Sequence, residues 1–137
     1  MSSLKKFIAE FIGTFVLVFF ACGTAAVLGC KTNSPDVAYL ATALAFGLVI
    51  VAMAYSIGNI SGCHINPAVS VAMLISGKMT VSDFAGYIVS QFAGAIAGAA
   101  ALMGVIGKDM GLGQNGLYNN DIVASLVIEI ILTFVFV

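Results

Sequence analysis

Long apolar runs separated by short polar segments dominate the chain. Three runs, residues 7–28, 37–57 and 84–106, carry few or no charges and match the roughly 20 residues that a helix needs to cross a bilayer. A fourth run, residues 122–137, reaches the last residue. The pattern predicts an all-α membrane protein with three transmembrane helices and the start of a fourth.

A short segment between the second and third runs has the features of a helix start. Pro67 suits a first helical turn, because the N–H that proline lacks would have no partner there, and Asn66 is a favoured N-cap. The helix that follows, residues 67–76, ends at Gly77 and is too short to span. Irregular backbone survives at membrane depth only beside protein or a water-filled cavity. We therefore expect a re-entrant half-helix.

Composition supports a membrane location. Hydrophobic residues make up 61% of the 137 residues and charged residues 8%, and the mean hydropathy is +1.14, so lipid is the expected solvent for most side chains. We expect a multi-pass protein of the cell membrane, with the lipid bilayer as its partner and no nucleic acid.

The lysines give a weak indication of orientation. If the N-terminus is cytoplasmic, Lys5, Lys6 and Lys78 face the cytoplasm, while Lys31 and Lys108 face outside. This bias favours a cytoplasmic N-terminus but leaves opposite or mixed insertion open.

A signal peptide is an alternative for the first run. Lys5 and Lys6 precede apolar residues, and residues 27–30, Val-Leu-Gly-Cys, resemble a lipoprotein processing site. Glu10 early in the run argues against it, as do the membrane segments that follow. We therefore keep the first run as a transmembrane helix.

The sequence contains the start of an internal repeat. Residues 10–16, Glu-Phe-Ile-Gly-Thr-Phe-Val, are echoed by residues 129–135, Glu-Ile-Ile-Leu-Thr-Phe-Val. With three spans in each unit, a second unit would insert in the opposite direction, as in inverted-repeat transport proteins. Residues 1–121 are thus expected to form one unit and residues 122–137 the truncated start of a second.

The segment around the half-helix resembles a known family. The first pore loop of the aquaporin, or major intrinsic protein, family has the pattern Ser-Gly-x-His-x-Asn-Pro-Ala-Val followed by Ser or Thr, and every fixed position matches residues 61–70. Residues 43–48 resemble the second helix of bacterial water-selective members, and residues 9–15 resemble the first. The resemblance covers essentially the whole chain. It implies an aquaporin-like fold and a passive transmembrane water channel, tetrameric when complete.

The resemblance assigns the pore motif to Asn66, Pro67 and Ala68. In such a loop the Asn side chain donates to passing water, and the half-helix dipole places roughly half a positive charge there, which opposes cations. The loop carbonyls expected along the water path are those of Gly62, Cys63, His64 and Ile65.

Apolar residues that match lumen positions of the family are Leu17, Phe46 and Ile50. Phe46 matches a constriction residue that is usually Phe in water channels and Trp in glycerol facilitators, so it favours water. The alternative for Phe46 is a packing or lipid-facing aromatic. The sequence contains no Arg and no second Asn-Pro-Ala, so it leaves the selectivity undetermined.

Two glutamates, Glu10 and Glu129, lie inside predicted spans, where a carboxylate is costly unless it is paired or hydrogen-bonded. The resemblance implies that Glu10 braces the loop of residues 62–65 and that Glu129 braces a counterpart loop. A carboxyl group kept in its neutral form is the alternative. In the third run, Gly94 and Gly98 predict close helix packing, and Gln91 a hydrogen bond across helices.

No cofactor or metal site is expected. His64 lacks a second ligand nearby, so a hydrogen-bonded loop brace is preferred. The Cys63 thiol either borders the lumen, where a mercurial would block flow, or faces away as a buried group. The cysteines, too few and scattered for a disulfide framework or a zinc site, are Cys22, Cys30 and Cys63.

Several functions stay open. Passive water conduction leads, with glycerol or another small neutral solute as its variant. A non-conducting truncated membrane fragment comes second, and a dual-topology transporter of antiparallel chains third. An enzyme is not expected, because no segment unites a nucleophile, a base and an orienting group.

Overall fold

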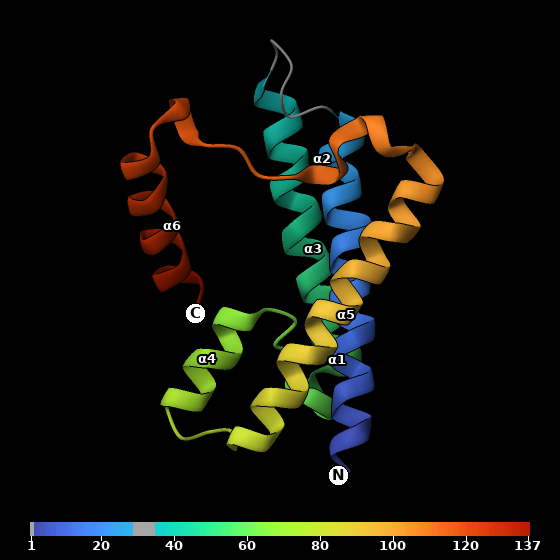
Figure 1. The fold of residues 1–137 in the computed structure, drawn as a ribbon, viewed down its shortest axis with the longest axis vertical. Helices are drawn as coiled ribbons and strands as arrows, with labels where there is room; N and C mark the ends of the chain where they lie inside the picture. The colour runs from blue at the N-terminus through green and yellow to red at the C-terminus, as the bar shows by residue number, and fades with distance from the viewer. Residues whose placement is uncertain (1, 29–34) are drawn as a thin grey trace.

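The computed structural model describes residues 2–28 and 35–137, and every regular element within these ranges is helical (Figure 1). The first helical segment of the bundle runs continuously from Ser3 to Leu28 and contains a π-helical turn in its middle. The elements in order are α1 (Ser3–Leu17), η1 (Val18–Cys22), α2 (Gly23–Leu28), α3 (Pro35–Ser61), α4 (Pro67–Ile75), α5 (Val81–Ile106), η2 (Lys108–Gly113), η3 (Tyr118–Asn120) and α6 (Ile122–Phe136).

Among the described residues, three helical segments are long and apolar enough to cross a membrane: Ser3–Leu28, Val37–Ser61 and Val81–Ile106. The predicted fold class is confirmed. Each helix extends beyond its apolar run, because a helix continues through polar residues where a cap allows it. The Thr80 hydroxyl, for example, accepts the N–H of Asp83 at 3.1 Å and so starts α5 before the predicted run.

Helix α1 packs against both α3 and α5, while α4 packs against α5 (Figure 1). Close approach of α1 and α5 depends on the predicted small residues. A Cβ on Gly94 would collide with the carbonyl oxygen of Phe11, and one on Gly98 would lie 2.8 Å from that of Phe15. The two backbones are therefore in direct contact, as expected where small residues line a membrane helix crossing.

The last helix stands apart from this bundle. Asp121 caps α6 by accepting the N–H groups of Val123 at 2.9 Å and Ala124 at 3.0 Å. No residue of α6 is buried, and its tertiary contacts are made mainly with η3 (Figure 1).

Candidate pore loop

The half-helix α4 begins where the sequence predicts. Asn66 has an extended backbone, Pro67 occupies the first helical turn, and the Asn66 Oδ1 accepts the N–H of Ala68 at 2.8 Å. Because this bond fixes Oδ1 as the acceptor, the Asn66 Nδ2 is free to donate elsewhere. The helix ends through Gly77, whose φ is +71°, with the N–H groups of Gly77 and Lys78 bound to the carbonyls of Leu74 and Met73.

The loop before α4 has a strained backbone. Gly62, Cys63 and Ile65 all have positive φ, at +86°, +53° and +42°. Glycine adopts this region readily, but a β-branched residue does so rarely, at a cost on the order of 1–3 kcal/mol. Something outside the loop must therefore hold it in this shape.

The carboxylate of Glu10 is the main support of the loop. It lies on α1, is 0% exposed, and accepts four hydrogen bonds. Its Oε1 accepts the Ser61 hydroxyl at 2.6 Å and the His64 N–H at 2.9 Å. Its Oε2 accepts the Ile65 N–H at 2.7 Å and the Gln91 amide at 2.8 Å. Four donors around two oxygens fill the hydrogen-bonding capacity of this buried side chain.

Two further groups hold the start of the loop. The Ser61 Oγ accepts the Cys63 N–H at 3.1 Å, and the Tyr87 hydroxyl donates to the Ser61 carbonyl at 2.6 Å. The N–H groups of three successive loop residues, from Cys63 to Ile65, are thus all bound to side-chain oxygens. Across the described ranges, no hydrogen bond uses the carbonyls of residues 62–65. The loop therefore turns its donors inward and keeps its acceptors free.

The structure places two of the three predicted lumen residues beside the loop. Leu17 and Ile50 pack with Cys63 against a buried cluster of Ala9, Ile57 and Ile65. Phe46 is half-buried and lies outside that cluster. Cys63 is half-buried and has a free thiol, and Cys30 lies outside the described residues, as does Lys31.

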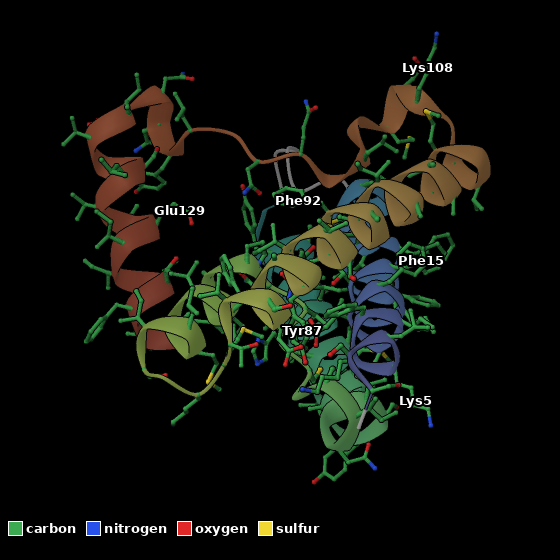
Figure 2. All side chains as sticks on the ribbon, turned by 60° about the horizontal axis from the view of Figure 1, so that its bottom comes forward. Lys5, Phe15, Tyr87, Phe92, Lys108 and Glu129 are labelled. Carbon is green, nitrogen blue, oxygen red and sulfur yellow. The ribbon has the colours of Figure 1, made fainter. Side chains whose placement is uncertain are left out.

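Glu129 has no comparable surroundings. It is exposed on α6, apart from Tyr87 and the loop (Figure 2). Its carboxylate has no hydrogen bond within residues 2–28 and 35–137. The structure therefore does not bring the two repeat-related glutamates together.

Sequence reasoning missed the roles of Ser61, Ser70 and Tyr87. Tyr87 and Gln91 lie one turn apart on α5, so both face the loop, and this spacing was the available indication. Ser70 is 0% exposed and contacts both His64 Nδ1 and Gln91 Nε2 at 3.0 Å. Within the described part of the chain, no cluster of His, Cys, Asp and Glu could hold a metal ion.

Comparisons with known proteins agree with this geometry. The family model described as major intrinsic protein matches residues 1–137. The chain is 42% identical to Aquaporin Z of Brucella melitensis biotype 1 over 98% of its length, and 41% identical to Aquaporin Z of Rhodopseudomonas palustris over 96%. It spans 63% and 59% of the lengths of these relatives.

A solved structure gives a similar result. The crystal structure of the aquaglyceroporin from Plasmodium falciparum superposes with a TM-score of 0.67 and 31% identity, over 76% of this chain and 42% of that one. The prediction that the chain is not an enzyme agrees with these relatives. The three long apolar helices among its described residues and the whole-length match make the chain a membrane protein of the major intrinsic protein family.

Proposed function

We propose that the chain forms one half of a passive water channel of the cell membrane. One observation carries this proposal: the loop N–H groups are bound to the side chains of Ser61 and Glu10, whereas no described residue binds the carbonyls of residues 62–65 or the Nδ2 of Asn66. A path for water needs fixed acceptors and donors that replace hydration, between otherwise apolar walls. The names of the two Aquaporin Z relatives support the same function.

Each part of the loop has a role in this proposal. The free carbonyls accept hydrogen bonds from passing water, and the Asn66 Nδ2 donates to it. The N-terminus of α4 adds a partial positive charge of roughly one half, which repels cations. Leu17 and Ile50 supply the apolar wall beside Cys63.

The counterpart of this wall comes from a second, inverted unit in the proposed channel. Glu129 then braces the loop of that unit, and burial of the apolar surface of α6 accompanies this assembly. The complete channels associate into homo-oligomers, with the tetramer as the expected form.

The N-terminus faces the cytoplasm in the proposed orientation. Lys5 and the connection from α4 to α5, which contains Lys78, lie at one end of the bundle, and Lys108 lies at the other (Figures 1 and 2). The excess of lysine at the N-terminal end supports this orientation.

Facilitated diffusion of glycerol is the second candidate. The 31% identity to the Plasmodium falciparum aquaglyceroporin favours it, whereas Phe46 favours water. A glycerol gradient applied to proteoliposomes that contain this chain separates the two candidates. Vesicles with a water-selective channel shrink fast and stay shrunken, whereas vesicles with a glycerol facilitator swell again as glycerol enters.

The test of the proposed function is osmotic shrinkage of proteoliposomes that contain this chain, followed by stopped-flow light scattering. We expect shrinkage faster than that of empty vesicles, and we expect Asn66→Asp to abolish it because an added carboxylate replaces the amide donor. The control is Asn115→Asp in an exposed loop. In this test both walls must come from two copies of the chain inserted in opposite orientations. Baseline shrinkage of the parent chain with confirmed insertion would contradict conduction by this chain alone and support a non-conducting half of a channel.

A further inference from the structure

A chain of buried hydrogen bonds runs from Glu10 to His64. The Gln91 Nε2 lies 2.8 Å from the Glu10 Oε2 and 3.0 Å from the Ser70 Oγ. The Ser70 Oγ lies 3.0 Å from the His64 Nδ1. Gln91 is 1% exposed, Ser70 0% and His64 7%. These side chains connect α1, α5 and α4 with the loop.

The other donors around Glu10 fix the direction of the first bond. Each Glu10 oxygen accepts a backbone N–H, Oε1 from His64 and Oε2 from Ile65, so Gln91 turns its NH₂ group toward Oε2. The opposite orientation would place two acceptor oxygens against each other. In this orientation the Gln91 Oε1 is buried with no hydrogen-bond partner among the described residues.

The direction of the remaining bonds follows. The second hydrogen of the Gln91 NH₂ group points at the Ser70 Oγ, which therefore accepts. The Ser70 proton then has two acceptors in reach, the His64 Nδ1 at 3.0 Å and the Asn66 carbonyl at 3.4 Å. An O–H···O bond is normally about 2.5–3.0 Å long, so the carbonyl is the poorer acceptor. The Ser70 hydroxyl therefore donates to the His64 Nδ1.

We propose that Ser70 is a positioning residue that fixes the neutral His64 ring in the tautomer with its proton on Nε2. An Nδ1 that accepts a hydrogen bond carries no proton, so Nε2 must carry it. The ring itself is held by Tyr87, whose centroid lies 4.9 Å away at an interplanar angle of 64°.

The Nε2–H faces the exposed start of the loop. A Cβ placed on Gly62 would lie 3.4 Å from the His64 Nε2. No described residue forms a hydrogen bond with this nitrogen. This step rests on the proposed water channel. The His64 Nε2–H then supplies the water path with a side-chain donor beside the free loop carbonyls. Glu10 thus sets a proton position in His64 through two intervening side chains.

Nitrogen NMR tests this directly, because His64 is the single histidine of the chain. We would label histidine with ¹⁵N, reconstitute the protein in lipid, and record spectra at mildly alkaline pH, where an ordinary imidazole is neutral. The expected spectrum shows an attached proton at Nε2 and none at Nδ1. A proton at Nδ1, or an even mixture of the two tautomers, would overturn the inference.

Two variants and a control isolate the role of Ser70. Ser70→Ala removes the hydroxyl donor and is expected to abolish the preference for Nε2–H, whereas Ser70→Thr keeps the hydroxyl and the preference. Ser76→Ala removes an exposed hydroxyl after the last turn of α4 and should change nothing. Full retention of Nε2–H in Ser70→Ala would exclude the role of Ser70. If that variant does not fold, the parent spectrum still decides the tautomer.

The same measurements separate this inference from the proposed function. The Nε2–H tautomer in a protein without water flow would contradict the channel and leave the tautomer assignment standing. Fast water flow with the proton on Nδ1 would contradict the tautomer assignment alone.

Discussion

The Oε2 of Glu10 accepts the backbone N–H of Ile65 at 2.7 Å, at a residue whose φ is +42°. A left-handed β-branched residue costs on the order of 1–3 kcal/mol, and a buried N–H without a partner costs a similar amount. The Glu10 carboxylate on α1 offsets both the cost of the left-handed backbone at Ile65 and the cost of burying its N–H. It thereby keeps the loop in a shape that its own backbone preferences oppose.

Close contact between α1 and α5 is expected to depend on Gly94. The Ala side chain of Gly94→Ala would collide with the Phe11 carbonyl oxygen, and backbone cannot move aside without shifting a helix. We expect a loss of about 1–3 kcal/mol in the free energy of unfolding, measured by circular dichroism during denaturation in detergent. Gly104→Ala, in the same helix with open space around it, should be neutral or stabilising. Equal effects of both variants would refute this packing argument.

The ion pair between Lys6 and Asp83 is expected to contribute little. The two groups lie 2.9 Å apart, but their side chains are 29% and 18% exposed, and such pairs contribute about 0–1 kcal/mol. Asp83→Asn should therefore lower the free energy of unfolding by less than Gly94→Ala does in the same assay. A larger loss would show that the end of the bundle is less solvated than its exposure indicates.

Reaction of Cys63 with a mercurial is expected to block water flow. The half-buried Cys63 packs against the same buried cluster as Leu17 and Ile50, so an added mercury atom would narrow the proposed path. Osmotic shrinkage should fall to the rate of empty vesicles, and Cys63→Ala should be insensitive although Cys22 and Cys30 remain. Undiminished flow after complete labelling of Cys63, checked by mass spectrometry, would place the thiol outside the path.

Sequence patterns predicted the helices well because hydropathy and capping are local properties. The start of α4 at Pro67 and the tight contact at Gly94 and Gly98 follow from residues within one turn of each other. The surroundings of Glu10 do not, because its partners Ser61 and Gln91 are brought to it only by the packing of α1, α3 and α5.

The positive φ values of Cys63 and Ile65 also lay beyond local reasoning. Neither residue type favours that conformation, so only the tertiary hydrogen bonds explain it. The π-helical turn from Val18 to Cys22 was equally unexpected from an apolar run with uniform composition.

The osmotic permeability of proteoliposomes that contain Glu10→Gln tests whether the Glu10 carboxylate holds the proposed water path open. Glutamine offers one acceptor oxygen in place of two, and its NH₂ group cannot accept the donors that it would face. In one orientation these donors are the His64 N–H and the Ser61 hydroxyl. In the other they are the Ile65 N–H and the Gln91 amide. Vesicles with Glu10→Gln are expected to shrink at the rate of empty vesicles, whereas vesicles with the exposed control Asp109→Asn should match the parent. Parent-like water flow through Glu10→Gln would contradict the claim that this carboxylate holds the water path open.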